Sequence, residues 1–597
     1  MKKIYLLLFF ICSTSTFGQS HSFNSKDYTV TRSDIETNYF EKDSTANALV
    51  IYEFGKSYVN DNTFMLTHEF KQKLKILNRK GFDKATITVY LYNSDKKKEK
   101  ITKLFATSHS LVNGKVVTTK LKENEIYTEK YNDNYTLVKF TLPNVQEGTV
   151  ITYSYTLTLP FIYKYKSWEF QSEIPKLYSE YNTSIPANYE YRIKLVGSIP
   201  LITNEATITR DCLEAGRGGS SDCTESIYIM KDIPAFIEED YMTTKDNYLS
   251  RIEYELKIVQ GFDGVVDNIT KTWKTTDSEI KGNKNIGKQL NKNVNKEDLL
   301  NAAILNEADP LKKAELIYTH IQNNYTWNNA YKIFSDVSVK EVIEKKSGNV
   351  SGMNILLHNL LKACDIDVKP ILLSTRNNGL ATTIYPVMSD FNYLIVQATI
   401  NNKTYLLDAT NKYLYFGQIP FRCLNQYGRL LDFKNESKWV NIEAAKTSNT
   451  SYRVNLNLDN ELNITGEVDF ITRGYHALSR KESYFENATQ HENNLANKYE
   501  NITFSEYQAE TTEINSLDFK EIFKINYEVE KIGDHIYLEP FIFKFFEENP
   551  FKLQERSYPI DFGYKDTYVY SYKIKVDDAF EIVETPKEVM LQLPENA

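Results

Sequence analysis

Apolar and polar side chains alternate over residues 149–159, and this pattern predicts a β-strand. One parity is apolar throughout: Ile151, Tyr153, Tyr155, Leu157 and Leu159. The other parity is polar over residues 152–158, which is the pattern of a strand with one buried face. Residues 85–92 and 189–196 alternate in the same way. We therefore expect residues 20–260 to form an N-terminal β domain, either a sandwich or a curved antiparallel sheet.

The composition fits a folded, sheet-rich protein and argues against general nucleic-acid binding. The 43 Tyr and 32 Phe among 597 residues favour strands. Lys and Arg number 71 against 79 Asp and Glu, a formal charge of −8, whereas neutralising phosphates needs a net basic face. At roughly 150 residues per domain, the chain is long enough for about three or four domains.

The first 19 residues have the layout of a secretory signal peptide. Lys2 and Lys3 precede an apolar run over residues 4–12, and small residues lead to Gly18. We therefore expect an exported protein, located in the periplasm or at the cell surface, including the periphery of the outer membrane. Lipidation at Cys12 is the less favoured alternative, because the preceding Ile is larger than a lipobox accepts. No later run approaches 18 apolar residues, so no transmembrane segment is predicted.

Four cysteines follow the predicted leader. Cys212 and Cys223 flank a glycine-rich segment that can reverse direction, and an oxidising compartment would allow them to pair. Cys423 is a second candidate for chemistry, as a reactive thiol. No Cys or His spacing suits zinc, so neither a metal nor a cofactor is predicted.

The middle of the chain, residues 265–440, changes to helices followed by strands. Asp309-Pro310 supplies a helix cap and a proline in the first turn. Apolar periodicity predicts helices over about 310–325, 339–345 and from 349, and strands over 369–374, 392–399 and 404–408. Residues 450–597 return to alternation and predict a C-terminal β-sandwich. The fold class is therefore multi-domain and mainly β, with a central α+β core.

Three short runs in the middle region follow one order. They are Gly348-Asn349-Val350 at a helix start, Phe391-Asn392-Tyr393 at a strand start, and Leu407-Asp408-Ala409-Thr410 after the next strand. In this order they resemble the transglutaminase-like superfamily. That superfamily places a nucleophilic Cys at a helix N-terminus, a His at the start of a later strand and an Asp after the next one. The resemblance implies a papain-like core.

The flanks resemble two β domains of unknown function that accompany such cores in exported bacterial proteins. Residues 143–153 and 168–175 carry the resemblance on the N-terminal side. Residues 549–551 and 558–563 carry it on the C-terminal side.

The resemblance implies that the reacting residues are replaced. Val350 stands in place of the Cys and Asn392 in place of the His, while Asp408 is retained. Valine has no nucleophilic atom, and an amide does not exchange protons near neutral pH. We therefore predict no thiol chemistry at this position. His358, in the helix after Val350, is expected to be solvated.

The favoured hypothesis is a non-catalytic, exported binding or scaffold protein for a peptide or glycan. Candidate ligand-binding residues are Asn349, Arg376, Trp327, Tyr385 and Tyr393. One alternative is an amidase, protease or transglutaminase-type enzyme that uses other residues, such as Cys423. Another is an envelope assembly or adhesion module that binds an envelope protein through its sheet edges. A further alternative is that Asp408 and Asn392 simply satisfy one another or backbone groups in an inert core.

Overall fold

The computed structural model describes residues 23–592, except residues 38, 95, 133, 216–218, 270 and 512. The predicted signal peptide and Cys12 lie outside the described residues. The chain forms two compact units: Met1–Glu238 with Tyr248–Thr270, and Glu239–Asn247 with Lys271–Ala597. No helix in the described part combines the length and the apolar character needed to cross a membrane.

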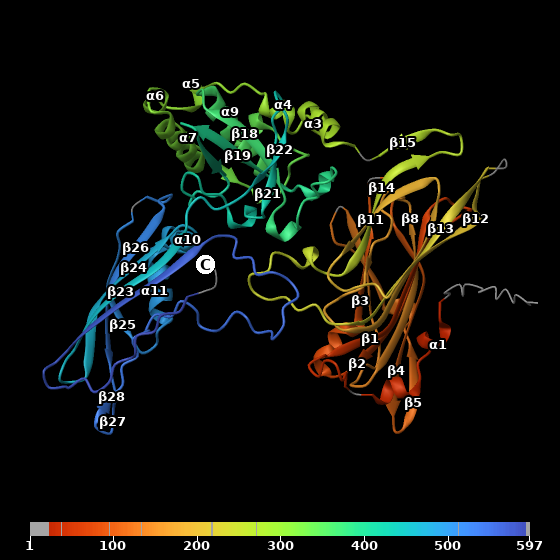
Figure 1. The fold of residues 1–597 in the computed structure, drawn as a ribbon, viewed down its shortest axis with the longest axis horizontal. Coiled ribbons are helices and arrows are strands. Elements are labelled where there is room, and N and C mark those ends of the chain that lie inside the picture. The colour runs from red at the N-terminus through yellow and green to blue at the C-terminus, as the bar shows by residue number, and fades with distance from the viewer. Residues whose placement is uncertain are drawn as a thin grey trace, which may run out of the picture. The chain divides into compact units, whose positions relative to one another are not determined.

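The first unit is built of sheet, as the alternation predicts (Figure 1). Its eight-stranded sheet has the order β12-β13-β10-β1-β2-β8-β4-β5, and its neighbours are antiparallel except β1 with β10. These strands are β12 Thr203–Ala215, β13 Gly219–Ile233, β10 Lys176–Pro186, β1 Ala48–Val59, β2 Leu66–Ile76, β8 Val150–Leu159, β4 Lys100–Val112 and β5 Lys115–Lys120. Two smaller sheets contain β3 Thr86–Tyr92, β7 Tyr135–Thr141, β6 Ile126–Lys130, β11 Tyr189–Val196, β14 Arg251–Gln260, β15 Val266–Asn268 and β9 Trp168–Glu169. The predicted strands at 85–92, 149–159 and 189–196 are confirmed within about one residue as β3, β8 and β11.

The centre of this unit is packed around one tryptophan. The Trp168 indole stacks on the Tyr181 ring at 5.1 Å, and its Nε1 donates to Ser179 Oγ at 3.0 Å. Gly55 of β1 leaves room for the indole, since a Cβ there would lie 2.2 Å from Trp168 Cζ3. Glycine is therefore required by close packing and not by backbone conformation.

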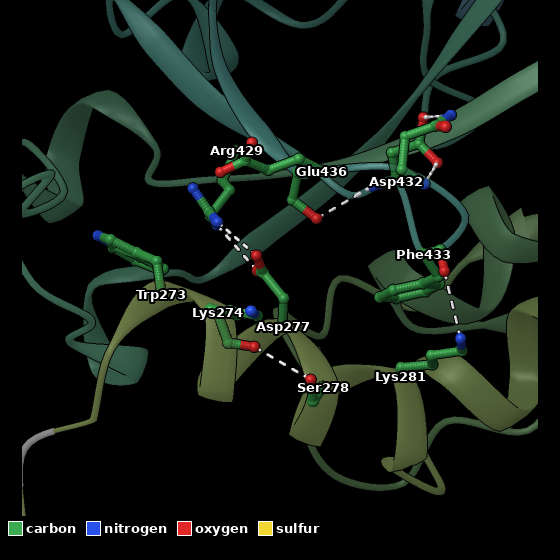
Figure 2. Close-up of a pocket in the computed structure, with 11 residues that line it drawn as sticks. Trp273, Lys274, Asp277, Ser278, Lys281, Arg429, Asp432, Phe433 and Glu436 are labelled. Atoms are coloured by element: carbon green, nitrogen blue, oxygen red, sulfur yellow. Dashed lines mark hydrogen bonds and ion pairs between the residues drawn. The ribbon is translucent and has the colours of Figure 1, made fainter.

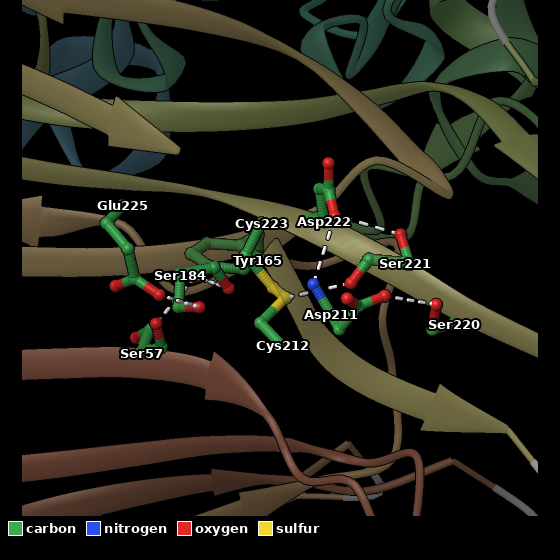
Figure 3. The surroundings of a disulfide bond; sticks show 10 residues. All are labelled: Ser57, Tyr165, Ser184, Asp211, Cys212, Ser220, Ser221, Asp222, Cys223 and Glu225. Carbon is green, nitrogen blue, oxygen red and sulfur yellow. Dashed lines mark hydrogen bonds between the residues drawn. A yellow bond between two sulfur atoms is a disulfide. The ribbon is translucent and has the colours of Figure 1, made fainter. Parts of the chain in front are cut away.

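Cys212 and Cys223 form a disulfide across the β12–β13 ribbon (Figure 3). The pairing register of the two strands shifts between Thr209 and Leu213, which places Cys212 inside an irregularity. Asp211 has φ +49° there, so the chain turns out of the regular strand. A disulfide is stable in an oxidising compartment, which agrees with an exported environment.

The core of the second unit contains the predicted helices and strands. Helices α7 (Pro310–Asn324), α8 (Val339–Lys345) and α9 (Val350–Ala363) precede a five-stranded antiparallel sheet. That sheet has the order β20-β19-β18-β21-β22, with β18 Asp367–Leu373, β19 Tyr393–Ile400, β20 Lys403–Leu407, β21 Tyr427–Leu430 and β22 Lys438–Asn441. Helix α9 packs against β18 and β19 on one side and against α7 and α8 on another, so its residues from Val350 to Leu361 are buried.

The predicted C-terminal β-sandwich is wrong. Residues 448–576 form one five-stranded sheet, ordered β25-β26-β24-β23-β29. Its elements are β23 Ser448–Leu458, β24 Asn463–Arg473, α10 Tyr475–Glu486, α11 Ala488–Asn497, β25 Thr503–Ala509, β26 Asp518–Glu528 and β29 Asp566–Val576. Apart from these, the described residues of the region contain two strands, β27 Lys531–Ile532 and β28 His535–Ile536.

Helix α10 and an irregular segment around Phe543 cover the face that a second sheet would cover. Arg480 of α10 lies 4.3 Å from the centre of the Phe470 ring, and Phe543 stacks on Tyr452 at 5.1 Å. Alternation shows that one face of a sheet is buried, but it does not show whether a sheet or a helix buries it.

The C-terminal motif over residues 549–563 is hydrogen-bonded to the short segment Glu239–Asn247, which belongs to the same unit. Glu239 accepts hydrogen bonds from the backbone N–H groups of Lys552 and Leu553 at 2.9 and 2.7 Å, and from Arg556 Nη1 at 3.3 Å. Its side chain is 7 % exposed. These residues therefore have a structural role.

Candidate functional site

Helix α9 begins at Val350, the residue that the resemblance predicts in place of a nucleophile. Asn349 caps it: Oδ1 accepts from the Gly352 N–H at 2.9 Å, and Nδ2 donates to the Asp336 carbonyl at 2.7 Å. Val350 is fully buried, and its N–H donates to the Ala330 carbonyl at 3.1 Å. The oxygen and the nitrogen of the Asn349 amide are thus both hydrogen-bonded within the protein. This candidate ligand-binding residue therefore caps α9.

The side-chain hydrogen bonds of Asn392 go to Thr375 and not to Asp408. Asn392 Oδ1 accepts from the Thr375 N–H, and its Nδ2 donates to Thr375 Oγ1, both at 2.9 Å. The next residue, Tyr393, points the other way, because side chains alternate along β19. Tyr393, and not Asn392, reaches the surroundings of Asp408.

Asp408 is a fully buried carboxylate with three hydrogen bonds. Its Oδ2 accepts from Asn354 Nδ2 at 2.9 Å, and its Oδ1 accepts from Thr410 N–H and Oγ1 at 2.9 and 2.5 Å. Asn354 Oδ1 also accepts from the Ala409 N–H at 2.8 Å. Asp408 therefore ties α9 to the end of β20. It does not pair with Asn392.

A cationic side chain that the sequence analysis did not select lies at this place. Arg422 Nη2 donates to the Tyr393 hydroxyl at 3.1 Å and to Thr410 Oγ1 at 3.0 Å. Its guanidinium lies 4.6 Å from the Trp327 ring centre and 6.0 Å from that of Tyr331. We call Trp327, Tyr331, Tyr393, Thr410 and Arg422 the Arg422 cluster.

The cluster lies beside the first turn of α9. Trp327 Nε1 donates to the Ala330 carbonyl at 3.3 Å, the same carbonyl that accepts from the Val350 N–H. Trp327 is half-buried and Tyr331 is 46 % exposed. Two predicted ligand-binding residues, Trp327 and Tyr393, thus come together around Arg422.

Burial and neighbouring charges raise the pKa of two groups of the cluster, Tyr393 and Arg422. Burial, followed by the nearby Asp408 carboxylate, raises the pKa of Tyr393 well above 10. Burial opposes the charge of Arg422, but Tyr393 and Asp408 outweigh this effect and raise its pKa. The phenol therefore stays protonated and the guanidinium charged, and neither can act as a base at neutral pH.

Cys423 lies next to Arg422 in the chain but is fully buried. Burial and then the charge of Asp408 raise its pKa well above 9. Thiol chemistry requires an accessible thiolate. The geometry therefore does not support Cys423 as a nucleophile.

The other two candidate ligand-binding residues lie elsewhere. Arg376 is 4 % exposed and forms an ion pair with Asp561 at 3.0 Å, while its Nη1 also donates to the Leu424 carbonyl at 2.9 Å. It joins the core to the C-terminal segment. Tyr385 is half-buried in the loop between residues 379 and 387.

The prediction of a solvated His358 is wrong. His358 is 5 % exposed, and its Nδ1 shares a hydrogen bond of 2.8 Å with Asn359. Burial lowers its pKa to about 4. Among the described residues, no group of three or more His, Cys, Asp or Glu side chains is arranged to hold a metal ion.

A separate pocket of about 460 Å³ lies between α3 (Trp273–Gly282) and the turn from β21 to β22 (Figure 2). Arg429 lies 4.3 Å from the Trp273 ring centre, and its Nε donates to Asp277 Oδ1 at 3.0 Å. Lys281 Nζ donates to the Phe433 carbonyl at 3.2 Å. Arg429 and Asp277 are thus hydrogen-bonded to each other, and Lys281 is hydrogen-bonded to the backbone. We therefore do not place the binding site in this pocket.

Three family models match the chain in the predicted order. Residues 64–212 match DUF3857, a domain of unknown function, residues 297–405 match the transglutaminase-like superfamily, and residues 534–596 match DUF3858, a second domain of unknown function. The central match includes Val350 and Asn392 and ends before Asp408. No curated protein matches the chain significantly.

Solved structures resemble the chain only distantly. A protein from Parabacteroides distasonis, described as a “putative protease”, is 12 % identical with a TM-score of 0.43, over 81 % of this chain and 93 % of that one. Yeast LTA4 hydrolase with bestatin is 11 % identical with a TM-score of 0.17, over 36 % and 29 %. Legionella pneumophila aminopeptidase A is 14 % identical with a TM-score of 0.19, over 36 % and 22 %.

Proposed function

Because residues 297–405 form a transglutaminase-like core between two domains of unknown function, we propose that the chain is an exported, non-catalytic binding protein that uses this core to hold a peptide. The observation that carries the proposal is the Arg422 cluster beside Val350. In this proposal Val350 and Asn392 stand in place of the nucleophile and the base, and the groups that lie beside the buried Val350 are a protonated phenol and a charged guanidinium.

The cluster keeps chemical groups that suit binding. Trp327 and Tyr331 offer partly exposed rings, on which peptide side chains can pack. Arg422 offers a charged donor that is half-buried and held in place by Tyr393 and Thr410. Buried aromatic and arginine side chains are the residues that most often dominate the binding energy of protein interfaces.

Binding to an array of synthetic ten-residue peptides tests the proposal. Native protein is expected to bind a subset, and Trp327→Ala to weaken that binding by about tenfold or more, since the indole supplies a large apolar surface. Trp273→Ala is the matched control, because it removes an indole from the other pocket, and binding should be unchanged. Tyr331→Ala, at an exposed ring, repeats the test without a buried truncation.

Mass spectrometry of the bound peptides separates binding from catalysis. Intact peptides are expected, with no cleavage and no conversion of Gln to Glu. Turnover that Cys423→Ser abolishes would replace this proposal with the enzyme hypothesis. Loss of binding in Trp273→Ala, with Trp327→Ala unaffected, would move the site to the pocket of Figure 2 and favour a different ligand.

A further inference from the structure

Arg422 has hydrogen-bond donors to spare. A guanidinium carries five N–H groups, and the hydrogen bonds of Arg422 to described residues come from Nη2 alone. Its Nε is buried without a partner in the described part of the chain. Leaving a buried hydrogen-bond donor unpaired is unfavourable, so an acceptor beside this Nε would be stabilising.

Arg422 already has one carboxylate near it, Asp408, so each negative charge that a ligand adds is repelled by that carboxylate as well as attracted by the guanidinium. Thr410 Oγ1 accepts from Arg422 and donates to Asp408, so the buried carboxylate and the guanidinium are coupled through one hydroxyl. A dianionic phosphate would add two charges beside that carboxylate. A monoanionic carboxylate adds one, and it is a favoured partner of a guanidinium.

The aromatic rings around Arg422 determine which chemical groups can lie next to a bound carboxylate. Trp327 and Tyr331 flank the guanidinium at 4.6 and 6.0 Å, and the two rings meet edge to face at 5.3 Å. A group attached to the bound carboxylate would therefore meet aromatic surface. An apolar side chain next to a carboxylate fits this surface better than a polyhydroxylated sugar does.

We propose that the Arg422 cluster recognises a carboxylate group of a peptide, with an apolar or aromatic side chain beside it. This inference rests on the proposed function and names the chemical group that the binding site reads. The carboxylate can come from a chain terminus or from an Asp or Glu side chain.

Ligand-observed saturation-transfer NMR with small probes tests the proposal on the full chain. N-acetyl-phenylalanine presents a terminal carboxylate, its amide removes the charge at nearly constant shape, and N-acetyl-glutamate amide presents a side-chain carboxylate. Native protein is expected to bind at least one acid about tenfold more tightly than N-acetyl-phenylalanine amide, because charge-assisted hydrogen bonds are the stronger class. Which acid binds better identifies the source of the carboxylate.

Arg422→Met should abolish the preference for the acid while binding of the amide stays within about twofold. Arg453→Met is the control, because this arginine is 63 % exposed on the outer face of the C-terminal sheet. Equal binding of acids and amide by the native protein would overturn the inference even if a variant failed to fold. A preference that persists in Arg422→Met would also overturn it. If acids and amide bind equally while Trp327→Ala still loses peptide binding, the carboxylate inference fails and the proposed function stands.

Discussion

Replacing Glu521 should destabilise the C-terminal sheet and remove most of its sensitivity to acid. Glu521 of β26 is fully buried and accepts hydrogen bonds from Arg480 Nε and Nη2 at 2.5 and 2.7 Å. His491 Nε2 and the Tyr507 hydroxyl lie 2.9 Å from its Oε1. A single carboxylate therefore joins α10, α11, β25 and β26.

The size of the effect follows from the pKa of Glu521. Burial opposes ionisation, but Arg480 and His491 outweigh it and lower the pKa from 4.5 to about 2. A difference of about 2.5 pH units corresponds to about 3 kcal/mol of folding stability. Because the folded pKa is the lower one, this stabilisation is fully present above about pH 4.5 and is lost as the pH falls toward 2. By pH 3 about 2 kcal/mol should be gone.

Amide hydrogen exchange in β24 and β26 is the suitable assay, because the four tryptophans all precede residue 450 and do not report on this sheet. At pH 7, Glu521→Gln should speed exchange by about a hundredfold or more, since it leaves Arg480 buried without its charge partner. Exchange rates are corrected for the intrinsic rate of an unprotected amide at each pH. The native sheet should then lose protection from exchange between pH 7 and 3, whereas the sheet of the variant should not. Glu510→Gln is the matched control, because Glu510 is 49 % exposed in its pair with Lys520 and should matter by about 1 kcal/mol or less. Native-like exchange in Glu521→Gln, or equal acid sensitivity in both proteins, would refute this reasoning.

Two further predictions concern buried side chains. Iodoacetamide should leave Cys423 unmodified in the native protein at pH 8 while Cys364, which is 8 % exposed, reacts first; fast modification at Cys423 would reopen the enzyme hypothesis. Gly55→Ala should cost about 1–3 kcal/mol in urea unfolding, because the new Cβ meets the Trp168 indole at 2.2 Å. Gly282→Ala, where a Cβ meets no atom within 4 Å, is the control and should be close to neutral.

The sequence predicted the elements of the core well because local signals agree there. Asp309-Pro310 caps α7, and its Oδ1 accepts from the Lys312 N–H at 2.7 Å as an N-cap should. Helix α8, at Val339–Lys345, has the predicted bounds. These signals act over a few residues and do not depend on tertiary contacts.

The errors arose where the answer depends on partners distant in the sequence. The resemblance predicted that Asn392 would lie near Asp408, but Asn392 is hydrogen-bonded to Thr375, and it is the next residue, Tyr393, that reaches Thr410 beside Asp408. His358 looked solvated because one apolar face was assumed for α9, whereas the helix is buried on nearly all sides. Arg422 meets Tyr393 across 29 residues of chain, and no spacing rule connects it to Trp327.

Retention of Asp408 has an explanation that does not involve catalysis. Its oxygens accept from Asn354 of α9 and from Thr410 after β20, so it fastens the central helix to the sheet. Removing such a buried acceptor would leave these donors unpaired, which is costly whether or not the site reacts. Val350 at the start of α9 needs no such partner, because it is buried among apolar side chains. Asp408 is therefore held in place by contacts that do not involve Val350. The hydrogen bonds of Asp408 are accordingly explained by the fold alone, whereas the donors of the half-buried Arg422 that the described residues leave unused are the reason for proposing a ligand.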